Sequence, residues 1–296
     1  MDRYELFIVG AGAAGISAAV AAWDAGARSI LLADRAERLG GILPQCVHHG
    51  FGLASFGVEL TGAEYARELT KALDATGVTV SLQTAVLSVS ADRTALLSSR
   101  SGLRSIGFER MILATGCREE NIGSLAVSGT RPAGIFTAGQ AQELINLRQL
   151  DIGAEIVIVG SGDLGMIMAR RFTLEGKHVV AVIEKERSYG GMARNYHRCI
   201  EQYSIPVHCS TELTRIHGGE RVSAVGVRDR LTGQERRIEC DTLVTAIGLT
   251  PERTLVSRLG SPDWLALCGN CARVHDIVDS AVSEAKETGK LFGGLV

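Results

Sequence analysis

The sequence lacks an excess of charge of either sign. Its 296 residues include 31 Lys and Arg against 33 Asp and Glu, which leaves a formal net charge of −2. Proteins that hold nucleic acid or an anionic membrane surface by electrostatics carry a clear basic excess. The charge balance therefore favours neither partner. The apolar fraction of 46% is that of a globular protein able to bury a sizeable core.

A disulfide framework is also lacking. Small secreted domains carry an even number of closely spaced cysteines. Here the count is odd, seven, and the residues are scattered along the chain: Cys46, Cys117, Cys199, Cys209, Cys240, Cys268 and Cys271. The pattern predicts free thiols and a protein of the reducing cytoplasm.

A convincing membrane segment is lacking too. Residues 6–23 are uncharged and long enough to be considered as a span or as a signal sequence. However, the acidic Asp2 and Glu5 precede the run, where a signal sequence would carry basic residues, and glycines interrupt it. We expect no membrane span.

Glycine, by contrast, is abundant, with 35 residues in 296 against ~7% in average proteins. Gly10, Gly12 and Gly15 form a G-x-G-x-x-G motif between a strand-forming and a helix-forming run. In a dinucleotide-binding unit these glycines allow the tight turn, the approach of a pyrophosphate and the close packing of helix on strand. The next predicted strand, "SILLAD", ends in Asp34, placed to bind a ribose.

The whole unit occurs twice, at an offset of 150 positions. Three sets of residues repeat: the motif glycines (Gly160, Gly162, Gly165), the acidic residue (Glu184 for Asp34) and a glycine pair (Gly190-Gly191 for Gly40-Gly41). Each half continues into a predicted β-meander, turning at residues 101–102 and at 232–233, and then into a small-residue turn. The chain is therefore predicted to be an α/β protein with two Rossmann-like dinucleotide-binding domains, each with a β-meander.

This tandem arrangement resembles the two-dinucleotide-binding-domain flavoproteins, the FAD/NAD(P)-dependent pyridine nucleotide oxidoreductases. The resemblance covers nearly the whole chain. It implies that the first domain holds FAD and that the second, inserted into the first, holds NAD(P)H. The expected bounds are residues 1–124 with 249–296 for the FAD domain and 125–248 for the NAD(P) domain.

The resemblance also implies the cofactor-binding residues. For FAD it implies Gly10, Gly12, Gly15, Asp34, Gly41, Thr115, Gly116 and, where the family has a Gly-Asp, Asn270 after Gly269. For the nicotinamide nucleotide it implies Gly160, Gly162, Gly165 and Glu184. We add the neighbouring Ala14, Arg35, Val86, Asp163, Gly248 and His275 as cofactor-binding candidates. Glu184 favours NADH because it repels a 2′-phosphate, while Lys185 and Arg187 leave NADPH open.

Several blocks, among them "LGGILPQCVHHGFG", "ATGCRE" and "CGNCARVHDIVD", resemble a bacterial subgroup of this family. The subgroup includes FAD/NAD(P) subunits associated with glycerol-3-phosphate, proline and opine-type dehydrogenases. It implies hydride transfer between NAD(P)H and flavin and onward to a small-molecule substrate or a partner subunit. An electron-transfer subunit with little activity alone, in a hetero-oligomer, is the alternative; exposed apolar area around "CARVHDIVD" would favour it. The stretch before "LCGN" is shorter than in the family, only residues 261–266, which predicts weaker FAD binding or an exposed flavin.

The loop "GGILPQCVHHGFG" supplies the catalytic candidates Cys46, His48 and His49. A disulfide reductase needs a second cysteine close to the first, and Cys46 has none nearby in sequence. This argues against a disulfide reductase. The family resemblance implies instead that the loop faces the flavin, with either histidine donating a hydrogen bond or moving a proton; two solvated loop histidines are the alternative.

Two further interpretations rest on "CGNCARVH". Cys268 and Cys271 form a C-x-x-C pair, so a dithiol oxidoreductase remains an alternative. A zinc site would draw its ligands from Cys46, His48, His49, Cys268, Cys271 and His275. Because both stretches are expected beside the flavin, we predict no metal.

Overall fold

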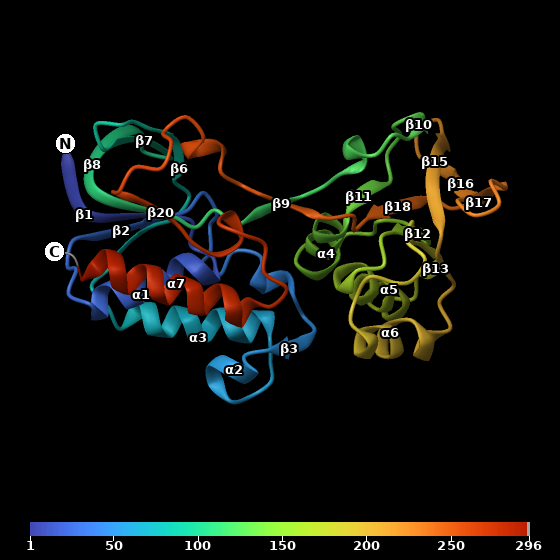
Figure 1. Ribbon diagram of the computed structural model, residues 1–296, viewed down its shortest axis with the longest axis horizontal. Coiled ribbons are helices and arrows are strands. Elements are labelled where there is room, and N and C mark those ends of the chain that lie inside the picture. Colours follow the sequence, from blue (N-terminus) through green and yellow to red (C-terminus); the bar gives the residue numbers. More distant parts are fainter. Residues whose placement is uncertain (295–296) are drawn as a thin grey trace. The chain divides into compact units, whose positions relative to one another are not determined.

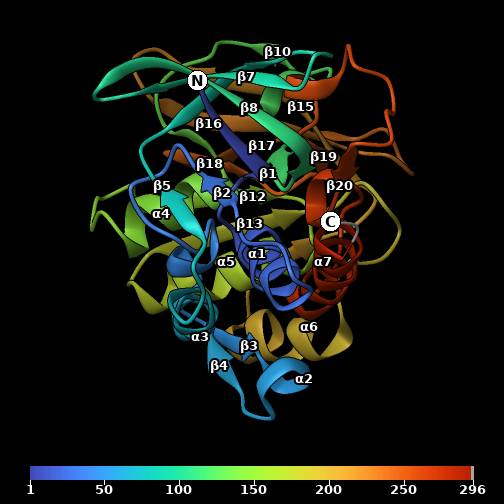
Figure 2. The same cartoon turned by 90° about the vertical axis from the view of Figure 1, so that its left-hand side faces the viewer.

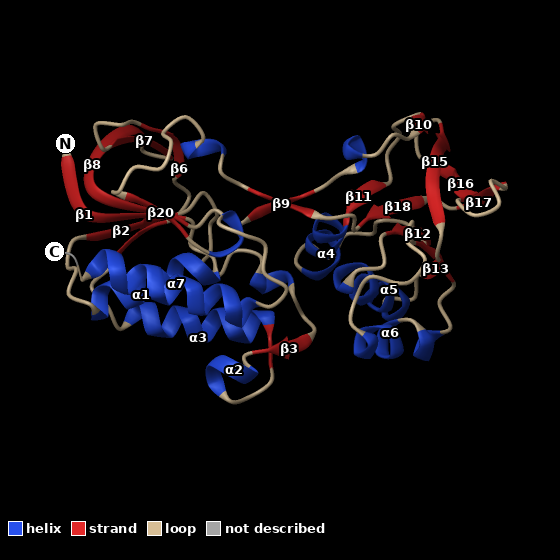
Figure 3. Cartoon of the chain, viewed as in Figure 1, coloured by secondary structure: helices blue, strands red, loops and turns tan. Residues whose placement is uncertain are grey.

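The computed structural model describes residues 1–294, which divide into two compact units. Unit 1 comprises Met1–Arg118 and the chain from Thr250 onward, and unit 2 comprises Glu119–Leu249. The chain passes between them at β9 (Cys117–Glu119) and β19 (Leu249–Pro251), which pair with each other. Figure 1 labels the elements, and Figure 3 shows that both units mix helices and strands.

Unit 1 is built on a seven-stranded sheet of order β5-β2-β1-β8-β7-β6, to which β20 adds beside β8. The strands are β1 (Asp2–Val9), β2 (Ile30–Ala33), β5 (Thr79–Ser81), β6 (Ala85–Val89), β7 (Thr94–Ser99), β8 (Gly102–Leu113) and β20 (Leu265–Leu267). β5, β2, β1, β8 and β20 run parallel, whereas β6, β7 and the start of β8 form an antiparallel meander. The first predicted meander is therefore confirmed.

Three helices cover one face of this sheet: α1 (Ala13–Asp24), α3 (Gly62–Asp74) and α7 (Val278–Gly293). Both views of the chain place them together on that side (Figures 1 and 2). Gly289 and Gly293 lie directly on the backbone of Ala18 and Ala22, which lets α7 approach α1 closely. A short hairpin of β3 (His49–Phe51) and β4 (Leu60–Thr61) carries α2 (Leu53–Phe56) between its strands.

Unit 2 repeats the plan with a five-stranded parallel sheet of order β11-β18-β12-β13-β14. Its strands are β11 (Ile135–Thr137), β12 (Glu155–Val159), β13 (His178–Ile183), β14 (Val207–His208) and β18 (Thr242–Thr245). A second sheet, β10-β15-β16-β17, contains the predicted meander: β10 (Ser128–Gly129), β15 (Thr211–Gly218), β16 (Val222–Asp229) and β17 (Glu235–Glu239). The helices are α4 (Ala138–Asn146), α5 (Asp163–Leu174) and α6 (Ala193–Cys199).

Each parallel sheet is buried on both faces, which explains its runs of Val, Ile and Leu. In unit 1, Ile8 and Leu32 pack toward the helices, while Phe7 and Leu31 pack toward the meander side. Unit 2 divides in the same way into two hydrophobic clusters. This layering brings the carboxyl ends of the parallel strands to one edge in each unit, the edge at which α/β proteins bind ligands.

Candidate functional site

The first glycine turn joins β1 to α1 and leaves open space at one position only. Gly10 has φ +104°, and a Cβ there would overlap the carbonyl oxygen of Ala114; a Cβ on Gly15 would overlap the carbonyl oxygen of Gly10. At Gly12, in contrast, the nearest atom to a Cβ would be the Cα of Gly41, at 3.8 Å. The turn is therefore tightly packed at Gly10 and Gly15, whereas the space in front of Gly12 is open.

The N-terminus of α1 is suited to an anion. Gly12 is the N-cap residue, no side chain caps the helix, and its first turn contains no acidic residue. The first backbone N–H groups and the helix dipole thus face the open space above Gly12. A Cβ would fill this cradle, and the pyrophosphate of a dinucleotide fits it. The residues present therefore fit FAD, the dinucleotide that the family resemblance implies for this domain.

Asp34 follows β2 and holds the glycine turn in place. Its Oδ2 accepts a hydrogen bond from the backbone N–H of Ala11 (2.6 Å), and its Oδ1 accepts one from Ala36 (2.8 Å). The carboxylate is half-buried, so part of it faces solvent beside the cradle. Its predicted contact with a ribose stays a prediction.

Unit 2 contains a second copy of this cradle. Gly160 has φ +105° and lies against the carbonyl of Ala246, Gly165 lies against Gly160, and a Cβ on Gly162 would meet nothing within 4 Å. The predicted repeat thus extends from sequence to the contacts of each glycine. The open space above Gly162 suits a nicotinamide nucleotide, as the space above Gly12 suits FAD.

Glu184 corresponds to Asp34 and is more deeply buried, at 8% exposure. Its Oε2 accepts hydrogen bonds from the Ser161 backbone N–H (3.0 Å) and hydroxyl (2.5 Å), and its Oε1 accepts one from the N–H of Glu186 (3.0 Å). Burial opposes ionisation, but these donors hold the pKa of Glu184 below its usual value. Glu184 is therefore an anion that fixes the second glycine turn.

Asp163 distinguishes the second cradle from the first. It opens α5, and its Oδ1 accepts hydrogen bonds from the backbone N–H of Met192 (2.8 Å) and from Asn195 Nδ2 (2.7 Å). The corresponding residue of α1 is Ala13. The second helix N-terminus therefore already carries a negative charge, which opposes a phosphate group.

The turn after β8 lies beside the segment that follows β20. Thr115 donates a hydrogen bond from Oγ1 to the carbonyl of Glu252 (2.6 Å), and the N–H of Cys268 donates to Leu113 (3.0 Å). Asn270 accepts from the N–H of His275 at Oδ1 (3.0 Å), while its Nδ2 contacts Cys117 Sγ (3.6 Å). Four of the predicted FAD-side residues are thus brought into one region: Thr115, Gly116, Asn270 and His275.

The short stretch at residues 261–266 still completes the sheet. Trp264 is buried, packs its ring 5.6 Å from that of Phe108 and accepts a hydrogen bond from the N–H of Met111. The chain then pairs with β8 as β20. The shortening has therefore not removed the strand that carries Gly269 and Asn270 to the edge of the sheet.

The family model for pyridine nucleotide-disulphide oxidoreductases matches residues 4–262. The chain belongs to this family. It is accordingly an oxidoreductase of a family that binds FAD and NAD(P). The family predicted from the sequence is thereby confirmed.

The similar proteins include both thioredoxin reductases and a subunit of an oxidase. Thioredoxin reductase of Treponema pallidum is 25% identical over 84% of this chain and 77% of its own length. Sarcosine oxidase subunit alpha of Corynebacterium sp. (strain P-1) is 30% identical over 98% of this chain, which spans only 30% of that subunit. Among solved structures, T. acidophilum thioredoxin reductase superposes with a TM-score of 0.79 at 22% identity, covering 99% of this chain and 98% of its own. This likeness confirms the predicted fold class.

Cys46 is a packed thiol. Its backbone carbonyl accepts a hydrogen bond from Gly62, the first residue of α3, and a Cβ on Gly62 would approach the Cβ of Cys46 to 2.6 Å. Burial raises the pKa of Cys46 to about 12, so the thiol stays protonated at neutral pH. This argues against nucleophilic chemistry at Cys46, a catalytic candidate in the sequence.

The two histidines of the same loop lie in different surroundings. His48 is half-buried, its Nδ1 is 3.0 Å from the carbonyl of His49, and its ring lies 5.1 Å from that of Phe51. His49 is exposed and pairs with Thr61 across β3 and β4. Their catalytic role stays a prediction, with His48 the more constrained of the two.

Cys268 and Cys271 are both fully buried but belong to different hydrophobic clusters. Cys268 packs on the helix side of the sheet, and Cys271 packs on the meander side, with its Sγ 3.0 Å from the carbonyl of Leu113. Burial raises the pKa of each thiol. The arrangement disfavours a dithiol that exchanges with an external substrate. Within residues 1–294, moreover, no three His, Cys, Asp or Glu side chains are grouped as metal ligands.

Three further cofactor-binding candidates are Arg35, Val86 and Gly248. Arg35 is exposed and close enough to Glu252 to help lower its pKa, after the hydrogen bonds from Thr254. Val86 is half-buried in β6, and Gly248 has φ +141° next to Glu120. Their contacts with a cofactor stay predictions.

Three residues that shape the cradles are absent from the sequence-based set. The backbone N–H of Ala11 donates a hydrogen bond to Asp34, and that of Ser161 donates one to Glu184. Their place between the first two glycines of each motif is a signal that points to them. Glu284 accepts from Gly269, but nothing in its helical sequence context marks it.

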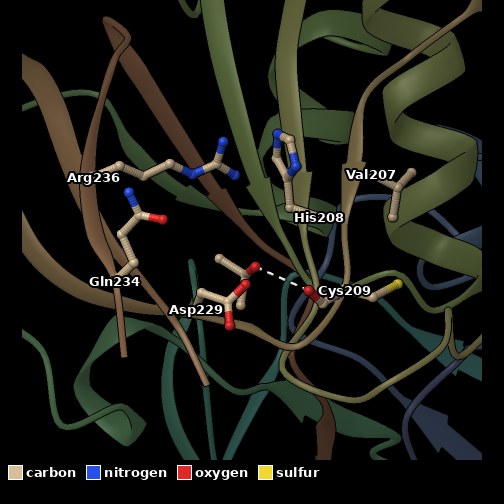
Figure 4. Close-up of a pocket in the computed structure, with 7 residues that line it drawn as sticks. Val207, His208, Cys209, Asp229, Gln234 and Arg236 are labelled. Carbon is tan, nitrogen blue, oxygen red and sulfur yellow. Dashed lines mark hydrogen bonds between the residues drawn. The ribbon is translucent and has the colours of Figure 1, made fainter. Parts of the chain in front are cut away.

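A separate pocket of about 390 Å³ lies in unit 2 between β14 and the meander (Figure 4). Its lining is mostly polar and includes His208, Cys209, Asp229, Gln234 and Arg236. Burial and the nearby Arg236 lower the pKa of His208, so its imidazole is neutral at pH 7. None of the predicted cofactor-binding residues lines this pocket.

Proposed function

We propose that this chain is an FAD-dependent oxidoreductase that takes electrons from NAD(P)H and passes them to a second substrate or partner. When bound, FAD would exchange hydride with the nicotinamide and electrons with the next acceptor. The observation that carries the proposal is the duplicated cradle, with Gly12 and Gly162 open and each turn tied to its own acidic residue. Two such cradles in one chain suit two dinucleotides.

In this proposal the residues of the chain bind FAD and orient it. The N-terminus of α1 holds the FAD pyrophosphate, and Asp34 accepts from the ribose at its exposed side. The turn at Thr115 and Gly116 and the segment at Asn270 and His275 line the flavin end. His48, fixed against Phe51, supplies a hydrogen bond or a proton.

We propose NADH as the preferred coenzyme. The anionic Glu184 stands where the ribose is expected and repels a 2′-phosphate. Lys185 and Arg187 are exposed on the same loop, and their positive charges favour the 2′-phosphate of NADPH. A comparison of flavin reduction by equal concentrations of NADH and NADPH decides the preference.

The visible spectrum of the purified protein before and after anaerobic NADH tests the main proposal. A two-band flavin spectrum that bleaches with NADH supports both cofactors and the path between them. A colourless protein that also fails to take up added FAD contradicts the proposal.

A second candidate function is that of an electron-transfer subunit in a heteromeric dehydrogenase. Exposed apolar side chains were the expected sign, and within "CARVHDIVD" Val274 is 39% and Ile277 51% exposed. Asp279, two residues on, is held by Ser55 of α2 and by Tyr65, and the nearby Leu53 is 69% exposed. Apolar surface of this kind is typical of partner contacts.

The named relatives support this second candidate, because one of them is a subunit of a larger oxidase. A yellow protein that NADH fails to bleach would favour it over the self-sufficient enzyme. The dithiol alternative is disfavoured by the burial of Cys268 and Cys271. A disulfide-dye reductase activity that disappears in Cys271→Ser would restore it.

A further inference from the structure

Glu284, in the second turn of α7, joins three parts of the segment that follows β20. Its Oε1 accepts a hydrogen bond from the backbone N–H of Gly269 (2.9 Å). Its Oε2 lies 3.1 Å from Arg273 Nε and 3.1 Å from His275 Nε2. One half-buried carboxylate thus contacts both the start and the end of the segment 269–275.

Gly269, whose backbone N–H donates the hydrogen bond to Glu284, lies beside the α1 cradle. Gly269 has φ +66°, and a Cβ on it would come within 2.6 Å of the Cβ of Ala14, in the first turn of α1. Asn270, next in the chain, bridges Cys117 and the N–H of His275 through its side-chain amide. Displacement of Gly269 would therefore displace both the rim of the α1 cradle and the Asn270 bridge.

The His275 side chain is only 5% exposed. The carboxylate of Glu284 lies beside its imidazole, and Arg273, 72% exposed, adds a cation on the same oxygen. The hydrogen bonds that the Gly269 N–H and Arg273 Nε donate to this ionised carboxylate are stronger than bonds between neutral groups. The segment is thus held by α7 as well as by its own backbone.

We infer that Glu284 is a positioning residue for FAD: it fixes Gly269 and His275 so that the segment 269–275 meets the cradle in its binding geometry. The inference rests on the proposed function, because it concerns the same cofactor site. Without Glu284 the segment 269–275 must be ordered when FAD binds, and the free-energy cost of this ordering lowers the affinity for FAD.

Four variants test the inference by FAD titration of the apoprotein, followed by flavin fluorescence and visible circular dichroism. Glu284→Leu keeps the helix propensity of the side chain but removes the acceptor. Glu284→Gln keeps an acceptor for the Gly269 N–H and removes the charge. Glu284→Asp keeps the charge but is one methylene shorter than the span requires. Glu287→Leu, exposed one turn along α7, is the matched control.

The expected order of affinity is Glu287→Leu equal to wild type, then Glu284→Gln, then Glu284→Asp and Glu284→Leu. Loss of a hydrogen bond to a charged group predicts a rise in Kd of roughly tenfold or more for Glu284→Leu. Glu284→Gln should recover most of that loss and show the flavin dichroism of the wild type. Recovery by glutamine is a readout that a purely structural role in α7 would not give.

Equal FAD affinity in Glu284→Leu, Glu284→Asp and wild type would overturn the inference. If Glu284→Leu fails to fold, as judged by far-ultraviolet circular dichroism, Glu284→Asp carries the same test. Failure of the proposed function is a separate outcome: the wild type itself would bind no FAD. The inference is then wrong together with the function, whereas tight binding by all variants rejects the inference alone.

Discussion

Replacement of Gly12 by valine should abolish tight FAD binding while the apoprotein stays folded. Gly12 has φ −78° and ψ −171°, an extended conformation that valine adopts without strain. The nearest atom to its Cβ would be the Cα of Gly41, at 3.8 Å. The stability of the apoprotein should therefore change by less than about 1 kcal/mol.

The magnitude of the loss in FAD affinity follows from the space above Gly12. A valine side chain fills the cradle in front of the α1 N-terminus, where a phosphate would lie. Overpacking of this kind costs about 1–3 kcal/mol, which raises the Kd for FAD by about 5-fold to about 150-fold. Titration of the apoprotein with FAD, followed by flavin fluorescence, measures this change.

Two matched variants separate the cradle from its scaffold. Gly15→Ala places a methyl group on the carbonyl oxygen of Gly10, so it should destabilise the apoprotein by more than about 3 kcal/mol in a thermal melt. Gly162→Val makes the same change as Gly12→Val in the second cradle and should leave FAD affinity unaltered. If Gly12→Val binds FAD as wild type does, or melts as early as Gly15→Ala, the reasoning about the first cradle is refuted.

Three further predictions concern charge and thiols. Asp163→Asn keeps an acceptor for Met192 and removes the charge at the α5 N-terminus, so the Kd for NADH should fall by about 2- to 5-fold; an unchanged Kd in a fluorescence titration would contradict this. Because the pKa of Glu184 is lowered in the folded state, its stabilisation is present above the ordinary glutamate pKa and is lost as the pH falls through the folded pKa. Glu184→Gln should thus cost about 1–3 kcal/mol at pH 7 and progressively less as the pH falls through the folded pKa, a trend that urea melts at decreasing pH measure. The pKa of Cys46, about 12, predicts that iodoacetamide leaves it unmodified at pH 7.5 in the native protein and that Cys46→Ala keeps its NADH-dependent activity; rapid labelling in a peptide map would overturn this.

Much of the fold was accessible from the sequence because its signals are local. The G-x-G-x-x-G motifs, the apolar strands before them and the meander turns each lie within a short stretch, and the offset of 150 positions relates Gly10 to Gly160. The strand β1 begins earlier than the apolar run, at Asp2, because pairing with β8 extends it. Pairing between strands that are distant in the chain, such as β1 and β8, cannot be predicted from a local sequence pattern.

The candidate site was only partly accessible, because its chemistry depends on burial and on contacts between distant residues. Cys46 is next to two histidines in sequence, and only its packing against α3 shows that the thiol is protonated. Cys268 and Cys271 have the spacing of a dithiol, yet they point into hydrophobic clusters on different sides of the sheet.

By itself, the sequence determined the two glycine cradles. The first and third glycines of each motif are required by a positive φ or by close backbone packing, and the middle glycine leaves the space open. It also determined the pairing of each cradle with an acidic residue 22 and 24 positions after its first two glycines, as with Asp34 after Gly12 and Gly10. The tertiary structure alone decided what those acidic groups bind and how the segment after β20 is held. Glu284 contacts Gly269 from 15 positions away, across a fold in the chain, and no periodic pattern encodes a contact made by packing one helix against a sheet edge.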